Sequence, residues 1–262
     1  MSSPAHPARF ENVSKLYVTR TGERTLALDD VSLDLGRGEI VVLLGPSGCG
    51  KTSLLRLLGG FEKPTAGRVL IDGAEVTDPG PDRGTIFQAP TLFPWLSALD
   101  NVLYGPRVRG LCSREMTARA RAALDNVGLA GFHDHLPHNL SGGMQQRVAI
   151  ARVLINDPRI VLADEPFAAL DEYTRRAMQD LFLHVVRDSA RTLLFVTHSI
   201  EEAVFLADRI AIMTPRPGQI RQCIDVALPR PRERSHRAFL DLMGSIFDIV
   251  SQDFTVALPE TS

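Results

Sequence analysis

The stretch Gly45-Pro46-Ser47-Gly48-Cys49-Gly50-Lys51-Thr52, followed by Ser53, decides the fold of this chain. It has the spacing of the phosphate loop G-x-x-x-x-G-K-[ST], in which glycines let backbone N–H groups turn inward around an anion. Lys51 supplies a positive charge for the outer phosphates, and the hydroxyl of Thr52 can bind Mg²⁺. The stretch therefore predicts a nucleoside triphosphate site built from residues 45–53.

The sequence on either side of this loop gives it the right setting. Residues 39–44 form an apolar run that predicts a buried strand, and residues 53–58 predict a helix with an apolar face. The start of that helix adds the positive end of its dipole to the anion site. The alternative is a glycine-rich turn that merely precedes a lysine, and the strand and helix argue against it.

Composition limits the class of protein. The chain has 262 residues, 44% of them hydrophobic, which suits one large α/β domain or a domain with a subdomain and a tail. A net charge of −2 gives no global basic field, so nucleic acid is not favoured as a partner. Three scattered cysteines fit a reducing cytosol. No apolar run approaches the ~18 residues of a membrane span, so a membrane role requires docking on another protein.

Hydrophobic patterns divide the rest of the chain. Alternation predicts antiparallel strands ahead of the nucleotide strand, and continuous apolar runs predict a parallel sheet covered on both faces. The alternating segments are 9–13, 26–28 and 31–35; the continuous ones are 160–163, 192–196 and 210–213; helical patterns cover 97–131, 141–155, 173–188, 200–207 and 238–251. Residues 1–8 are predicted to be a disordered lead. Residues 215–234, rich in proline and arginine, are predicted to be a linker. Its arginines over 230–234, with Arg237, are predicted to be solvated, and contact with anionic lipid is the alternative.

A strand that ends in two acids supplies the second chemical signal. In residues 159–166 the apolar run leads into Asp164 and Glu165. Asp164 can hold the Mg²⁺ that bridges the outer phosphates. Successive strand side chains diverge, so Glu165 can face the attacking water as a general base. The alternative is an acidic helix N-terminus with proline in its first turn.

A second anion cradle is predicted at Leu140-Ser141-Gly142-Gly143-Met144-Gln145-Gln146-Arg147. Ser141 is a good N-cap residue, and the two glycines leave the first N–H groups of the following helix accessible. Read alone, the segment could be an ordinary helix cap. Its place upstream of the acidic strand favours the anion site.

With these three motifs in this order, the chain resembles the ATP-binding subunits of ABC transporters. The resemblance implies ATP hydrolysis with ATP and Mg²⁺ as cofactors. It also implies an α/β fold, with a P-loop NTPase core of mostly parallel sheet, an N-terminal antiparallel β subdomain and a helical signature subdomain. On this basis the ATPase domain spans 9–229, with the helical subdomain at about 90–157, and a C-terminal linker and helical extension covers 230–262.

The resemblance also implies roles for individual residues. Gln88 would touch Mg²⁺ and water, and His198 would contact the γ-phosphate. Tyr17 would stack on adenine, and Asp171 would belong to the D-loop. The implied catalytic residues are Glu165, His198 and Gln88, and the implied metal ligands are Thr52, Gln88 and Asp164. Ser141, Gly142, Gly143 and Gln145 complete the ATP site of a second ATPase subunit placed head to tail, most simply in a homodimer. Each assignment has a plainer alternative, such as a surface amide for Gln88 or a strand aromatic for Tyr17.

Four further segments resemble the nitrate/sulfonate/taurine importer ATPases: 91–96, 197–205, 214–218 and 228–232. This implies a multi-span membrane permease as partner, a solute-binding protein as an indirect partner, and a peripheral place on the cytoplasmic face of the membrane. Phe93, Trp95 and Leu96 would line the groove that receives the permease, unless they are ordinary core. The rival readings are a soluble ABC-type ATPase acting on nucleic acid or ribosomes, a P-loop kinase or GTPase, and an exporter ATPase.

Overall fold

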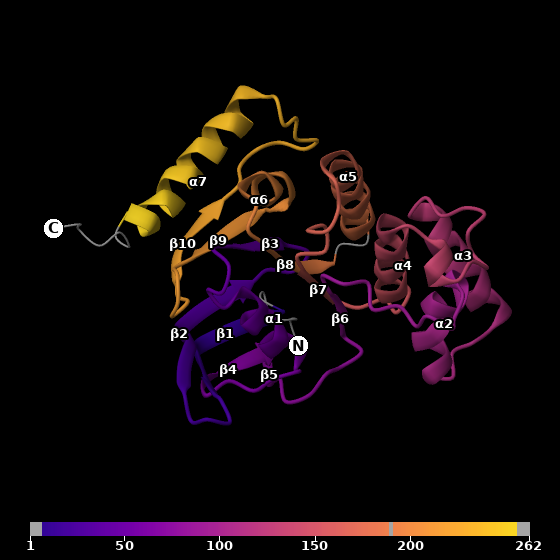
Figure 1. Cartoon of the computed structure of the whole chain (residues 1–262), viewed down its shortest axis with the longest axis horizontal. Helices are drawn as coiled ribbons and strands as arrows, with labels where there is room; N and C mark the ends of the chain where they lie inside the picture. Colours follow the sequence, from indigo (N-terminus) through magenta and orange to yellow (C-terminus); the bar gives the residue numbers. More distant parts are fainter. Residues whose placement is uncertain (1–6, 189–190, 256–262) are drawn as a thin grey trace. The chain divides into compact units, whose positions relative to one another are not determined.

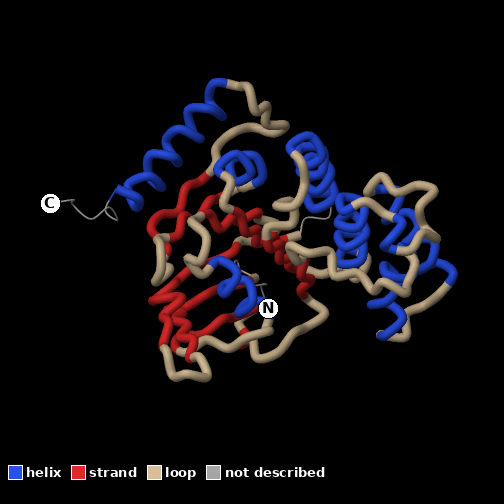
Figure 2. The backbone as a smooth tube through the Cα atoms, in the orientation of Figure 1, coloured by secondary structure: helices blue, strands red, loops and turns tan. Residues whose placement is uncertain are grey.

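The computed structural model describes residues 7–188 and 191–255. The predicted disordered lead therefore lies outside the described residues, except for Pro7 and Ala8. The chain divides into two compact units, residues 1–79 with 192–262, and residues 80–191. Figure 1 labels the elements of both units, and Figure 2 colours them by type.

An antiparallel sheet forms the first layer of the first unit. Its strands are β1 (Ala8–Val18), β2 (Arg24–Leu35), β4 (Ala66–Ile71) and β5 (Ala74–Glu75), in the order β2-β1-β4-β5. Phe10 and Val13 on β1 are both buried although they are three residues apart, because the strand is irregular between them, where Asn12 has a φ of 48°. β1 runs beyond the predicted strand and so carries Tyr17 into the sheet, opposite Thr25.

The strand that precedes the phosphate loop lies among parallel neighbours. Within the first unit the order is β10-β9-β3-β8, from β3 (Ile40–Leu44), β8 (Thr192–Thr197), β9 (Arg209–Met213) and β10 (Ile220–Asp225). Val42 in β3 pairs in parallel with Phe195 of β8 and Ile210 of β9. All five residues of β3 are buried, as expected for a sheet covered on both faces. Helix α1 (Lys51–Gly59) contacts β2, β4 and β8, so the loop between β3 and α1 is held between the two sheets.

The C-terminal part of the chain is more structured than its composition suggests. The predicted linker over 215–234 contains β10, which pairs antiparallel with β9. Most β10 side chains are exposed, so the strand lacks the apolar alternation that would have revealed it. Helix α6 (Ile200–Leu206) precedes β9, and helix α7 (Arg237–Thr255) ends the described part of the chain.

Helix α7 is amphipathic. Phe239 and Ile246 are buried on one side, and Leu240 and Phe247 are exposed on another. No helix within the described ranges combines the length and the apolar character that crossing a bilayer needs.

The second unit is mainly helical. Strands β6 (Arg83–Ile86) and β7 (Ile160–Asp164) pair in parallel, and the helices are α2 (Ala98–Val108), α3 (Arg114–Asn126), α4 (Gly142–Leu154) and α5 (Glu172–Asp188). Leu103, Leu124 and Val148, from α2, α3 and α4, share one buried apolar cluster. Helices α2, α3 and α4 contact one another, and Figure 2 draws them in blue. The mixed α/β architecture, with antiparallel and parallel sheets and a helical part, is the one predicted.

Candidate nucleotide site

The phosphate loop has the backbone that its sequence requires. Gly48 and Gly50 have φ angles of 78° and 101°, in the left-handed region that favours glycine. Gly50 is also packed tightly: a Cβ placed there would lie 2.5 Å from Cδ2 of Leu28 and 2.9 Å from the carbonyl oxygen of Ala27. The close packing fixes Gly50 as the N-cap of α1, so the first N–H groups of that helix open onto the loop.

Lys51 is buried inside this loop. Its side-chain ammonium donates to the carbonyl oxygens of Gly45 and Pro46, at 2.7 Å and 2.8 Å, and the residue is 5% exposed. Cys49 lies beside it, and burial raises the pKa of the Cys49 thiol although the Lys51 charge opposes this. The thiol therefore stays protonated, and the buried positive charge is carried by the lysine.

Tyr17 reaches the first turn of α1. Its hydroxyl donates to the carboxylate of Glu62 at 2.6 Å and lies 3.1 Å from the hydroxyl of Ser53. Burial, helped by Glu62, raises the pKa of Tyr17, so the hydroxyl remains a neutral donor. The ring is thereby anchored next to the phosphate loop, where an aromatic residue could stack on a base.

His198 follows β8 in a firmly held turn. The hydroxyl of Thr197 donates to the carboxylate of Glu202 and accepts the N–H of Ser199. Ser199 is the N-cap of α6, and its side chain accepts the N–H of Glu202. The neighbours on both sides of His198 are thus fixed by hydrogen bonds, and the imidazole itself is exposed.

The acidic pair lies in the second unit, where β7 ends. Asp164 is the last residue of the strand, and both acids are partly buried. Glu165 has a φ of 42°, an uncommon conformation for a residue other than glycine that costs on the order of 1–3 kcal/mol. The next turn closes with the N–H of Ala168 donating to the carbonyl of Glu165. The backbone therefore leaves the strand conformation directly after Asp164.

Gln88 is exposed after β6, and the segment that carries it is anchored by a residue of the Ser-Gly-Gly motif to which the sequence analysis gave no role. The buried amide of Gln146 donates to the carbonyl of Phe87 at 3.3 Å. Gln146 belongs to α4, so the residue before the predicted sensor glutamine is hydrogen-bonded to the helix of the Ser-Gly-Gly motif. The only sequence sign of this tie is a polar residue at a helix position that faces the core.

The Ser-Gly-Gly turn forms the start of α4 as predicted. Ser141 is the N-cap, and its hydroxyl accepts the N–H of Met144. A Cβ on Gly142 would meet nothing within 4 Å, whereas one on Gly143 would lie 3.3 Å from Thr174. The side-chain nitrogen of Gln145 donates to the carbonyls of Pro137 and Leu140, so this amide braces the turn from behind.

These residues share a cavity of about 520 Å³ within the second unit. Its wall includes Gln88, the Ser-Gly-Gly turn and Asp171. Asp171 accepts the N–H of Thr174, and this backbone hydrogen bond lowers the pKa of the Asp171 carboxyl. The described lining contains no lysine, arginine or histidine, although it opens on a helix N-terminus. The cavity therefore brings together an anion cradle and an amide, with no basic side chain to complete them.

The predicted permease segment is exposed at its centre. Trp95 is 72% exposed, which overturns the alternative that it is core. Phe93 and Leu96 are partly buried, and the Phe93 ring lies 5.7 Å from Trp95 and 4.3 Å from Tyr104. Phe93 and Tyr104 also line a hollow with Val108 and Arg152. The lining mixes apolar side chains with three arginines and an asparagine, and an exposed apolar patch bordered by polar residues is typical of a docking surface.

Comparison with known proteins points to one family. The family model described as ABC transporter matches residues 28–168. The chain is 46% identical over 250 residues to an uncharacterized ABC transporter ATP-binding protein of Methanocaldococcus jannaschii, covering 95% of this chain and 93% of that one. It is 51% identical over 217 residues to the taurine import ATP-binding protein TauB of Burkholderia thailandensis, covering 82% and 83%.

Among solved structures, the chain resembles the dimeric post-hydrolysis state of the ATP-binding cassette MJ0796 bound to ADP and Pi. The TM-score is 0.74 at 36% identity, over 85% of this chain and 100% of that one. A second dimeric structure of the same cassette gives a TM-score of 0.75.

Proposed function

This chain belongs to the ABC transporter family and is an ATPase that works with ATP and Mg²⁺, and on that premise we propose that it powers solute import through a separate membrane permease. The solute is a small molecule of the nitrate, sulfonate or taurine type. Similarity to taurine import ATP-binding proteins supports this class. In the proposal two copies act together, peripherally, at the cytoplasmic face of the membrane, and a solute-binding protein delivers the cargo to the permease.

We assign the contacts with one nucleotide to residues of the sequence motifs. Residues 45–53 cradle the phosphates, Lys51 binds the outer ones, and Tyr17 stacks on adenine. The Thr52 hydroxyl, the Asp164 carboxylate and the Gln88 amide offer the oxygen donors that Mg²⁺ prefers. Within the described residues no three acidic, histidine or cysteine side chains cluster, so phosphate oxygens would complete the coordination. When bound, Mg²⁺ neutralises charge that develops on the phosphates.

Hydrolysis then depends on three side chains. Glu165 takes the proton of the attacking water, Gln88 orients that water, and His198 donates to the γ-phosphate. Two features of the chain support these assignments: the strained backbone of Glu165 and the hydrogen-bonded turn on both sides of His198. Residues held so firmly need little reorganisation when the reaction occurs.

The observation that carries the dimer proposal is the composition of the cavity in the second unit. It offers Ser141, the N–H groups at the start of α4 and Asp171, yet its described lining has no basic side chain. A phosphate bound there would need positive charge from elsewhere. A second copy supplies it, because Lys51 and the phosphate loop of that copy arrive with the nucleotide already bound. ATP would then join the two chains, and hydrolysis would release them.

The hollow beside Trp95 is where we place the permease. Its mixed apolar and polar lining suits a short amphipathic helix, which would insert apolar side chains beside Phe93 and Tyr104. Arg152 contributes a cation to this lining, with its guanidinium 5.9 Å from the Phe93 ring centre. The hollow is lined by α2 and α4, and α4 begins at the Ser-Gly-Gly turn, so docking there can respond to ATP.

The experiment is solute uptake by the chain assembled with its permease in proteoliposomes. Trp95→Asp should abolish stimulation of ATP hydrolysis by the permease and solute uptake, while leaving the basal hydrolysis of the isolated chain within about twofold. Leu240→Asp, at an exposed apolar position on α7, is the matched control and should transport normally. Normal uptake by Trp95→Asp would show that the permease docks elsewhere.

A further inference from the structure

An arginine-rich strap, residues 228–236, lies against the C-terminal end of helix α6. The predicted solvated linker is therefore wrong at this point: Arg232 is only 8% exposed. Its guanidinium donates to five backbone carbonyl oxygens, those of Val204, Phe205, Ala207, Val226 and Leu228. A guanidinium with five donors in a planar fork can satisfy such a set, and no other side chain can.

Arg230 holds the same helix end from the neighbouring position. It donates to the carbonyls of Phe205, Leu206 and Ala207, at 3.3, 2.6 and 3.1 Å, and forms an ion pair with Asp208 at 3.0 Å. The last carbonyls of a helix have no partner within it, and they carry the negative end of its dipole. Two guanidinium groups supply both the missing donors and the opposite charge.

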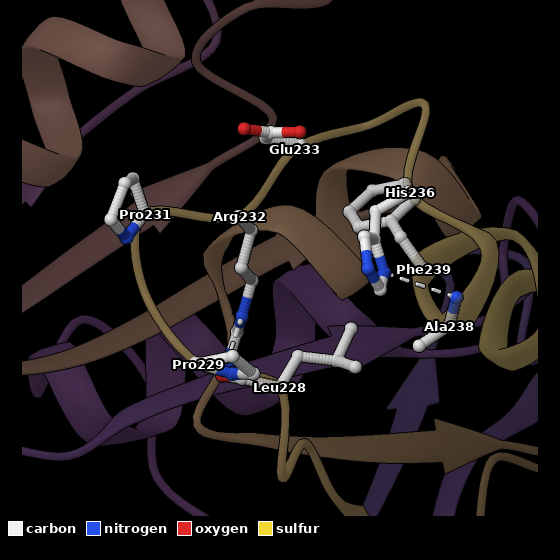
Figure 3. A pocket seen from close by; sticks show the side chains of 8 residues that line it. All are labelled: Leu228, Pro229, Pro231, Arg232, Glu233, His236, Ala238 and Phe239. Carbon is white, nitrogen blue, oxygen red and sulfur yellow. Dashed lines mark hydrogen bonds between the residues drawn. The ribbon is translucent and has the colours of Figure 1, made fainter.

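The strap also touches the side of α6. The guanidinium carbon of Arg234 lies 3.6 Å from the ring centre of Phe205, and its Nε lies 3.2 Å from the carboxylate of Glu201. Figure 3 shows the Arg232 side chain extending from the strap toward Leu228 and Pro229, with Glu233 turned the opposite way. A cavity of about 230 Å³ lies between the strap and the first turn of α7. The strap is thus tied to α6 by polar bonds and packed less completely toward α7.

The other end of α6 carries the histidine at the nucleotide site. Helix α6 has seven residues and begins two positions after His198. Its first turn is fixed by the Ser199 cap and by the bond between Thr197 and Glu202. A helix this short behaves as a rigid rod of about 10 Å, so a change in direction at its C-terminal end moves its N-terminal end as well.

We infer that Arg230 and Arg232 are positioning residues for ATP hydrolysis, which act through α6 to hold His198 in place. The inference rests on the role proposed above for His198. It makes the strap, and through it the C-terminal helix α7, a point from which the rate of hydrolysis can be changed without contact with the nucleotide. If the strap only stabilised the fold, the effect of its loss on kcat would not depend specifically on His198.

The first measurement separates turnover from binding in the full chain. Arg230→Ala should lower kcat roughly tenfold or more, the scale expected when a catalytic group is misplaced. The Kd for ATP should change less than about twofold, because the phosphate loop is untouched. Arg230→Lys keeps the charge but loses the fork, and should recover part of the loss. Arg237→Ala is the matched control, since Arg237 is 92% exposed and pairs only with Asp241 among the described partners; its kcat should be unchanged.

The deciding measurement is a double-mutant cycle with His198→Ala. If the strap acts through His198, Arg230→Ala should cause no further loss of kcat once His198 is gone. A loss of the same factor in both backgrounds would overturn the inference, as would an unchanged kcat in Arg230→Ala alone. If Arg230→Ala does not fold, Arg230→Lys and Arg232→Lys take its place in the same cycle, under the same criteria.

The cycle also separates this inference from the proposed function. Normal turnover by His198→Ala would remove the role of that histidine, and this inference with it. If His198→Ala turns over slowly and Arg230→Ala lowers kcat by the same factor in that background, the proposed function would stand. Only the inference about the strap would then be rejected.

Discussion

The phosphate loop and the Ser-Gly-Gly turn are both helix N-termini built on glycine, and they differ in how complete they are. The loop before α1 has a buried lysine, two left-handed glycines and a Cβ-excluding contact at Gly50. The turn before α4 has an exposed serine, open space around Gly142 and no basic neighbour in the described cavity lining. The phosphate loop is a complete phosphate site within its own unit. The Ser-Gly-Gly turn is incomplete, as expected of a surface that binds a nucleotide already held by another chain.

The largest effect should come from Glu165, because hydrolysis would release the phosphate loop of one chain from the Ser-Gly-Gly turn of the other. Glu165→Gln removes the proposed general base but keeps the size of the side chain, so turnover should fall by on the order of 10²–10⁴ while ATP binding persists. Hydrolysis and ATP affinity, measured on the same preparation, check this. Turnover close to that of the parent protein would take Glu165 out of the base role.

The next largest effect is expected at the phosphate loop, residues 45–53. Lys51→Ala removes the buried charge and its bonds to Gly45 and Pro46, so ATP affinity should fall by about two orders of magnitude. Titration calorimetry with ATP measures the loss. An affinity equal to that of the parent would contradict the assignment of residues 45–53 to the phosphates.

A substitution in the Ser-Gly-Gly turn should affect dimerisation and leave the ATP affinity of the monomer nearly unchanged. Ser141→Arg places a large cation at the exposed turn and should prevent ATP-driven dimerisation, while the ATP affinity of the monomer stays within about threefold. Ser141→Thr keeps the N-cap and serves as the control. Light scattering with and without ATP, in the Glu165→Gln background, gives the result. A Ser141→Arg variant that still dimerises would place the turn away from the interface.

The smallest effects come from a matched pair of glycine substitutions. Gly50→Ala meets Leu28 and the Ala27 carbonyl in a left-handed conformation, so it should lower the free energy of unfolding by about 1–3 kcal/mol and weaken ATP binding. Gly142→Ala meets open space at the start of a helix, so stability should change by less than about 1 kcal/mol. Chemical denaturation of both variants checks the pair; equal losses would mean that the two turns are packed alike.

What the sequence could predict was local. The phosphate loop, the strand that ends at Asp164 and the N-cap at Ser141 all follow from residues within one turn or strand of each other. The mixed α/β fold follows from the same strand and helix patterns, and the family comparison agrees with it.

What the sequence could not predict depends on distant partners. The buried amide of Gln146 finds the carbonyl of Phe87 59 residues away, and Arg232 finds the end of α6 about 27 residues away. Arginine in a proline-rich segment is usually solvated. Arg232 is buried because it donates to carbonyl groups at the end of a short helix, which have no partner within that helix. Strand β10 was missed for a similar reason, because an edge strand with exposed polar side chains carries no apolar alternation.

The most direct test of the two-cradle account mixes two inactive variants, Lys51→Ala and Ser141→Arg, in equal amounts. In a head-to-tail pair, one site of the mixed dimer carries both defects and the other carries neither, so the account predicts that the mixture hydrolyses ATP although each variant alone does not. A mixture that stays as inactive as its components would contradict the claim that two chains share each nucleotide.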